Sequence, residues 1–195
     1  MSKLMISLLA AAGIAFAGAA NAATTSTMSR DAYKAEKEKI EAQYKADKAQ
    51  CATMSGNAKD VCKEEAKGKD NVGKANLEAE YKNTDKARYN ARIAKANADY
   101  EVAKEKCDDM SGNQKDVCVK EAKAMRTKEK ANAKVAKVDS STVHDTANKR
   151  AEARTDARKD TREAEYKVAA EKCDALSGAA KDQCVKDAKA HYGKM

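Results

Sequence analysis

The chain has 195 residues, a formal net charge of +8, six cysteines and neither proline nor tryptophan. Beyond the first 22 residues, only 14 of the remaining 173 are Leu, Ile, Val or Phe, which excludes a conventional globular core. The composition is instead rich in Ala, Lys and Glu, which form helices readily, so it predicts long helices around a thin interior.

The N-terminal stretch 1–22 has the pattern of a cleavable secretory signal peptide. Lys3 supplies a positive charge, an apolar run follows, and residues 20–22 have the small-x-small pattern that signal peptidase recognises. The apolar run is shorter than the ~20 residues of a membrane span. We predict that the mature chain begins at Ala23, carries a charge near +7 and has no transmembrane segment. An uncleaved membrane anchor is the alternative.

Three copies of one cysteine motif follow: CATMSGNAKDVC at 51–62, CDDMSGNQKDVC at 107–118 and CDALSGAAKDQC at 173–184. An unbroken helix would separate the two cysteines of a copy by 11 × ~1.5 Å, far beyond the ~7 Å between Cα atoms that a disulfide tolerates. A chain reversal at Ser-Gly lets them meet. Because six cysteines in an exported chain indicate three disulfides, we predict one across each helical hairpin: Cys51–Cys62, Cys107–Cys118 and Cys173–Cys184.

Each reversal also has residues that favour a turn between helices. In the second copy, Asn113 is predicted to cap the following helix, with Asp116 in its first turn. The third copy has Ala179 in place of this Asn. Each disulfide is expected to contribute ~2–4 kcal/mol to stability. The residues predicted to end the leading helices in the left-handed conformation are Gly56, Gly112 and Gly178.

Two other roles are open to cysteines in such a chain. A redox pair is usually Cys-x-x-Cys at a helix N-terminus, and the spacing here is different. A copper(I) site would suit a cysteine with a methionine three residues later, as in Cys51 with Met54 and Cys107 with Met110. The third copy has Leu176 at the methionine position, which is typical of packing. The two histidines, His144 and His191, lie near no other candidate ligand in the sequence, so no metal or cofactor is predicted.

The copies match beyond their cysteines, as Y-x6-C-x2-[ML]-S-G-x2-K-D-x-C-x2-[ED]-A-K. They recur after 56 and then 66 residues, a period that indicates repeated helical hairpins. Apolar residues spaced four and three apart place the tyrosine, the first cysteine and the Met or Leu on one helix stripe. The residues predicted to pack in the seam between hairpin arms, rather than to form a ligand surface, are Tyr44, Tyr100, Tyr166, Met54, Met110 and Leu176.

The predicted fold class is all-α, with three disulfide-clamped antiparallel hairpins in an elongated coiled-coil-like bundle. Breaks fall in YKNTDK (81–86) and in VDSSTVHD (138–145), where Thr142 and Asp145 are spaced as a capping box. Residues 23–138 are predicted to form two hairpins packed as an antiparallel four-helix bundle, and residues 139–195 a third, lopsided hairpin. The six helices are predicted over roughly 29–55, 57–82, 85–111, 113–137, 143–177 and 179–192.

No catalytic motif stands out, since the chain lacks a Gly-rich phosphate loop, G-x-S-x-G and H-E-x-x-H. We therefore predict no enzyme. Basic and acidic residues alternate, as in KAEKEKIEAQYKADK, which is typical of exposed helix faces and not of nucleic-acid binding. The stretch 146–162 is richer in arginine and is predicted to be a solvated helix. The alternative is that it contacts lipid head groups or an anionic envelope polymer. The overlapping stretch 148–167 is either a solvated extension or an interface with a partner.

The leader, the strings AEYKVAAEKCDALSG and DYEVAKEKCDDMSGNQKDVCVKEAKA, and the Ala/Lys-rich linking helices resemble a group of proteobacterial periplasmic proteins. Members of this group are often labelled cell envelope biogenesis protein TolA, and TolA itself shares the Ala, Lys and Glu composition. The resemblance covers nearly the whole chain and implies a periplasmic protein of the cell envelope.

We therefore expect a non-enzymatic helical binding or structural protein of the periplasm, or one that is stress-related. The expected partner is an envelope protein or an anionic envelope polymer, and the chain is a candidate homo-oligomer. The alternatives are a periplasmic chaperone or holdase and a metal-sequestering protein.

Overall fold

A computed structural model describes residues 28–140 and 146–194, and all regular structure in these residues is helical. The order of helices confirms the predicted all-α fold of three hairpins. The leading arms end at or near the first cysteine, a few residues earlier than predicted. The helices are α1 (Arg30–Ala52), α2 (Gly56–Lys82), α3 (Asp85–Lys106), α4 (Gly112–Asp139), α5 (Thr146–Cys173) and α6 (Gly178–Tyr192), and the short 3₁₀ helix η1 (Cys107–Asp109) follows α3.

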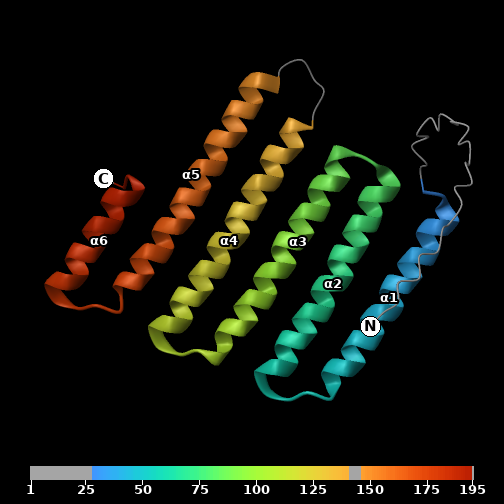
Figure 1. Cartoon of the computed structure of the whole chain (residues 1–195), viewed down its shortest axis with the longest axis horizontal. Helices are drawn as coiled ribbons and strands as arrows, with labels where there is room; N and C mark the ends of the chain where they lie inside the picture. Colours follow the sequence, from blue (N-terminus) through green and yellow to red (C-terminus); the bar gives the residue numbers. More distant parts are fainter. Residues whose placement is uncertain (1–27, 141–145, 195) are drawn as a thin grey trace, which may run out of the picture.

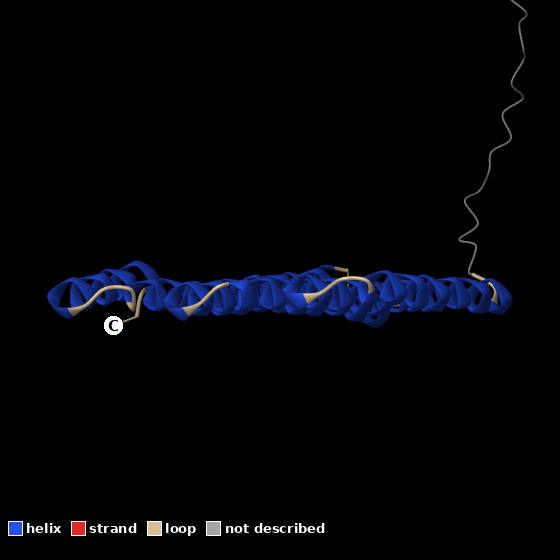
Figure 2. Ribbon diagram, turned by 90° about the horizontal axis from the view of Figure 1, so that it is seen from below, coloured by secondary structure: helices blue, strands red, loops and turns tan. Residues whose placement is uncertain are grey.

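The six helices lie side by side in a single layer (Figures 1 and 2). Within the described residues, extensive contacts join each helix only to its neighbours in sequence. The predicted four-helix bundle over 23–138 is therefore wrong, because α1 and α4 lie on opposite sides of the α2–α3 pair.

Small and aromatic residues on two opposite edges of α3 explain this flat arrangement. Ala98 faces Gly68 of α2, whereas Tyr100 stacks on Arg126 of α4. Two residues along a helix correspond to a rotation of about 200°, so these contacts point in nearly opposite directions. A helix with two such edges extends a layer, whereas a bundle needs one apolar stripe on each helix that faces a common axis.

The interior is as thin as the composition predicts. The largest side chains that are fully buried are three half-cystines, one at the end of each leading arm: Cys51, Cys107 and Cys173. Most other buried residues are alanines, joined by Leu77 and Tyr100, and no charged residue among the described ones is buried. The helices therefore hold together through close contact of small side chains and through the disulfides.

The three predicted disulfides are present, with Cα–Cα distances of 5.5 to 5.7 Å. The tip glycines adopt the predicted left-handed conformation, with φ of +60°, +56° and +57° in chain order. They begin the second arm of each hairpin, however, and do not end the leading arm as predicted. The prediction for Asn113 is wrong, because Ser111 occupies the N-cap position. Gly112 already belongs to α4, so Asn113 lies in the first turn and its side-chain amide donates a hydrogen bond to the backbone carbonyl of Glu171 in α5, at 2.9 Å.

The predicted break between the first two hairpins is also present. Asn83 ends α2 with a left-handed φ of +46°, and the Thr84 hydroxyl accepts a hydrogen bond from the backbone N–H of Ala87. The proposed capping box of Thr142 and Asp145, together with His144, lies outside the described residues.

The third hairpin has arms of unequal length, with 28 residues in α5 and 15 in α6. The stretch 148–167 does not project into solvent alone, because α5 lies along α4 (Figure 1). Ala153 is buried there, and Asp156 pairs with Lys134 of α4 at 2.7 Å. Its interface is thus with this chain's own fourth helix.

Candidate functional site

The described residues contain no cluster of His, Cys, Asp and Glu that could hold a metal ion. All six cysteines are in disulfides. The pKa values that depart from their ordinary range belong to side chains paired at the surface. For example, hydrogen bonds from Lys82 and Tyr33 lower the pKa of Glu78, and the bond to Glu78 raises the pKa of Tyr33. The grooves between neighbouring helices of the layer are therefore the candidate binding sites.

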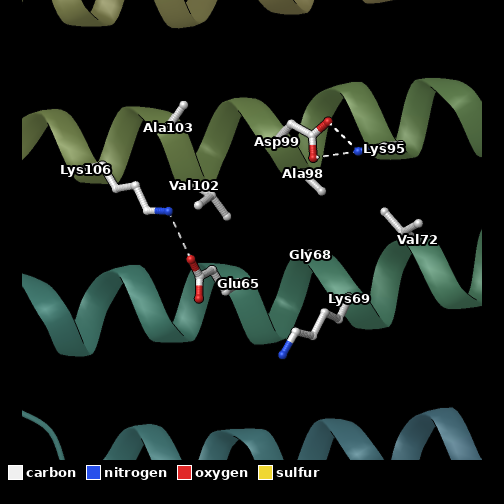
Figure 3. A pocket seen from close by; sticks show the side chains of 10 residues that line it. All are labelled: Glu65, Gly68, Lys69, Val72, Lys95, Ala98, Asp99, Val102, Ala103 and Lys106. Carbon is white, nitrogen blue, oxygen red and sulfur yellow. Dashed lines mark hydrogen bonds and ion pairs between the residues drawn. The ribbon is translucent and has the colours of Figure 1, made fainter.

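The first groove runs between α2 and α3 and has a volume of about 470 Å³ (Figure 3). Its floor is made of Gly68 and Ala98, and its apolar walls include Val72 and Val102. Gly68 matters here, because a Cβ at this position would lie 3.1 Å from the Cβ of Ala98. The absent side chain lets the two backbones approach closely, so the groove is shallow and lined by small apolar groups.

A second groove of about 530 Å³ runs between α4 and α5. Its lining includes Ala124, Met125, Val168 and Tyr192, the last contributed by α6. Val168 lies five residues before the first cysteine of its copy, as Val102 does in the preceding copy. Because the hairpins follow one another in one layer with their tips on the same edge, such equivalent residues lie on the same face. We call this side, carrying Val102 and Val168, the grooved face.

Ion pairs close both grooves at the end nearest the hairpin tips. Glu65 pairs with Lys106 at 3.1 Å across the first groove, and Glu121 pairs with Lys172 at 2.7 Å across the second. Along the wall of the first groove, Lys95 also pairs with Asp99 at 2.8 Å (Figure 3). These lysines are already neutralised locally, so the grooves offer apolar floors with balanced rims and no continuous basic track.

The Arg-rich stretch 146–162 is likewise engaged within the chain. Arg150 donates to the backbone carbonyl of Asp139 at 3.0 Å, and Arg154 pairs with the Asp139 carboxylate at 3.3 Å. Cations near the end of α4 also complement the negative C-terminal end of its helix dipole. These contacts assign Arg150 and Arg154 a role in joining α5 to α4.

The six residues predicted for the seam divide into two groups. Tyr100 is 8% exposed, with the Arg126 guanidinium 3.9 Å from its ring centre, and Tyr44 and Tyr166 are half-buried. The prediction is wrong for the second group, whose side chains are 41 to 45% exposed: Met54, Met110 and Leu176.

The turn geometry explains this exposure. Met110 follows the end of η1 and has an extended backbone (φ −99°, ψ 167°), so the helical spacing that relates it to Cys107 no longer holds. The three hairpin tips lie along one edge of the layer (Figure 1). Met54, Met110 and Leu176 therefore form a row of exposed apolar side chains on that edge.

Sequence reasoning missed both grooves, although the repeat carried a signal for them. Val102 and Val168 share one position of the motif, and Glu65 and Glu121 share another, each matched by a lysine before the first cysteine of the next copy. Such matches reveal a shared environment only once it is known that neighbouring hairpins pack side by side.

Comparisons of the chain with protein-family models, curated proteins and solved structures find no match. What the structure itself defines is an array of disulfide-clamped helical hairpins, and its three disulfides indicate a protein of an oxidising compartment. None of the helices in residues 28–140 and 146–194 combines the length and apolar content of a membrane span.

Proposed function

We propose that this protein is a non-enzymatic binding protein of the cell envelope that works in the periplasm and docks a helix of an envelope protein on its grooved face. The observation that carries the proposal is the pair of equivalent open grooves on one side of a single layer. The compartment is supported by the signal-peptide pattern of residues 1–22, by the disulfides and by the resemblance to periplasmic proteins.

A helix is the occupant whose chemistry fits the grooves. The first groove has Gly68 and Ala98 at its floor, where α2 and α3 pack closely, and the lining of the second includes Ala124 and Ala169. An amphipathic helix seats an apolar ridge in a groove of this kind, with charged flanks against charged rims. The paired lysines Lys106 and Lys172 make an anionic polymer a poorer occupant, since each would first have to leave its glutamate.

Site-specific photo-crosslinking in the periplasm of intact cells tests this proposal. A photoreactive amino acid placed at Val102 or Val168 should give the same defined adduct, and the crosslinked peptide should map to a helix of an envelope protein. The matched control is Lys123, which is exposed, lies about 200° around α4 from Met125 and lines a smaller groove of about 310 Å³ on the opposite face. The proposal fails if Lys123 gives the same adducts as Val102 and Val168, or if Val102 and Val168 give none.

A charge placed in each groove gives a second test of the same face. Val102→Lys and Val168→Lys are half-buried positions on helices, so the far-UV spectrum should stay helical while the adduct from a probe at Val72 or Met125 disappears. Lys123→Glu on the opposite face should leave the adduct unchanged.

The exposed apolar row also favours a second candidate function, that of a holdase. Met54, Met110 and Leu176 line one edge, and Met125 is 58% exposed on the grooved face. Methionine adapts to varied apolar partners. A holdase should suppress aggregation of several unfolded clients at stoichiometric ratios and lose this activity when the four residues are changed to Ser. Inactivity toward every client would remove this candidate.

A further inference from the structure

The contacts between successive hairpins repeat along the array. On the second arm of each of the first two hairpins, three residues lie four apart and therefore on one edge of the helix, facing the next hairpin. We call each set a junction stripe: Asn57, Val61 and Glu65 on α2, and Asn113, Val117 and Glu121 on α4.

The ends of the second junction stripe bind the following hairpin directly. The Asn113 side chain donates to the Glu171 carbonyl at 2.9 Å, and the Glu121 carboxylate pairs with Lys172 at 2.7 Å. Val117 lies between them and is half-buried. The stripe thus combines a hydrogen bond, an apolar contact position and an ion pair within two turns of helix.

The first junction uses the same positions with one difference. Glu65 pairs with Lys106 at 3.1 Å, and Val61 is half-buried as Val117 is. The side-chain amide nitrogen of Asn57 is buried, but it has no hydrogen-bond partner. The two asparagines thus occupy the same position, and only Asn113 donates a hydrogen bond to a backbone carbonyl of the next hairpin.

The third hairpin departs from this pattern on its outer arm, since α6 makes extensive contacts with α5 alone among the described helices. The corresponding residues of α6 are Ala179, Gln183 and Asp187, so the amide is missing and the valine is replaced by a polar side chain. Ala179 and Gln183 are exposed. A Gln pressed into a junction at this position would bury an amide without a partner, which costs free energy.

The first hairpin also differs from the other two, at the position whose side chain pairs with the glutamate of a junction stripe. The residue before the first cysteine is Lys106 in the second copy and Lys172 in the third, and both lysines pair with the preceding hairpin. In the first copy this residue is Gln50, which is exposed on α1, and α1 makes extensive contacts with α2 alone among the described helices. Changes at both ends thus fall at junction positions.

We infer that the outer edges of α1 and α6 are end caps that prevent one chain from adding to another edge to edge. The partner that a junction stripe fits is another hairpin of this same repeat, with a lysine before its first cysteine. Repeat arrays need terminal units with polar outer edges, because complementary open ends make a head-to-tail contact that does not close and so forms fibres. The inference is independent of which ligand the grooved face binds.

Restoring the junction residues at the two ends tests this inference. The variant Gln50→Lys, Ala179→Asn, Gln183→Val brings the amine introduced at position 50 of one copy against the Asp187 carboxylate of another. A zero-length carbodiimide crosslinker should then join these two positions between chains and give a ladder of oligomers. The wild-type chain should show only links within one chain, such as Glu65–Lys106 and Glu121–Lys172.

The reverse variant places cap residues inside the array. Asn113→Ala, Val117→Gln, Lys172→Gln should lower amide-exchange protection of residues 161–173 and of α6 by about tenfold or more, and leave α1 and α2 unchanged. The end variant is the matched control, since its three changes should not lower protection anywhere. The inference is overturned if wild-type chains already form links between α6 and α1 of different copies. It is also overturned if the end variant gives no link between positions 50 and 187, or if the reverse variant keeps full protection.

Discussion

The central disulfide offers the sharpest test of how this thin layer is held together. We consider the double substitution Cys107→Ala, Cys118→Ala, which removes the sulfur link at the tip of the second hairpin. This hairpin packs against a neighbour on each side, through α2–α3 and α4–α5. Loosening its tip therefore disturbs the middle of the array and not only one end.

The expected loss follows from the length of chain that the disulfide closes. The two cysteines are 11 residues apart in sequence, and a loop of that size removes about 9 cal/mol/K of entropy from the unfolded chain. At 25 °C this corresponds to about 2.8 kcal/mol. Cys107 is also fully buried, so lost packing adds to this figure. Domains are stable by only ~5–15 kcal/mol, so one disulfide accounts for a fifth to a half of that range.

Urea unfolding followed by far-UV circular dichroism measures the effect. The variant should remain helical without denaturant and unfold at a urea concentration lower by about 1–3 M, given slopes of ~1–3 kcal/mol/M. A matched double substitution, Cys173→Ala with Cys184→Ala, removes an equal loop from the last hairpin. It should destabilise mainly the short α6, because the extensive contacts of α6 within the described residues are with α5.

A free energy of unfolding within about 0.5 kcal/mol of wild type in the central variant would refute the reasoning. The alanine contacts would then hold the layer together, and the disulfides would contribute little to the free energy of unfolding. An equal response of both variants would show instead that the hairpins unfold independently of their neighbours.

Three further predictions concern single residues. Gly112→Ala should destabilise the protein by about 1–2 kcal/mol in urea titrations, because φ is +56° there although no atom obstructs a Cβ. Arg126→Gln should cost about 1 kcal/mol in the same assay, through loss of the cation–π contact with Tyr100. The pKa of Glu78 is lowered from 4.5, so its contribution to stability is present above pH 4.5 and is lost as the pH falls through the folded value. Tyr33→Phe removes one of the hydrogen bonds responsible, and carboxyl NMR titration should find the Glu78 pKa closer to 4.5.

Each of these predictions has a contrary outcome. A neutral Gly112→Ala would show that the tip adopts another backbone conformation. If Arg126→Gln costs no more than Lys123→Gln, the stack on Tyr100 is not a stabilising contact. An unchanged Glu78 pKa in Tyr33→Phe would mean that the pairing with Lys82 alone sets it.

The hairpins themselves could be predicted because their determinants are local. Two cysteines on either side of Ser-Gly, a glycine free to adopt a left-handed φ and long runs of helix formers all act within one hairpin. The disulfide pairing followed from the repeated motif together with helix geometry, and the tip glycines have the expected conformation. The row of Met54, Met110 and Leu176 was misplaced because helical spacing was extended past the last helical residue.

The sequence by itself determined helix positions, turns and sulfur links, since these depend on residues close together in the chain. Whether the hairpins close into a bundle or spread into a layer was decided only by tertiary structure. That outcome depends on which edges of each helix are small enough for close approach, as with Ala98 on one side of α3 and Tyr100 on the other. In an alanine-rich helix a small side chain is common on every edge, so composition and spacing alone could not distinguish the two arrangements.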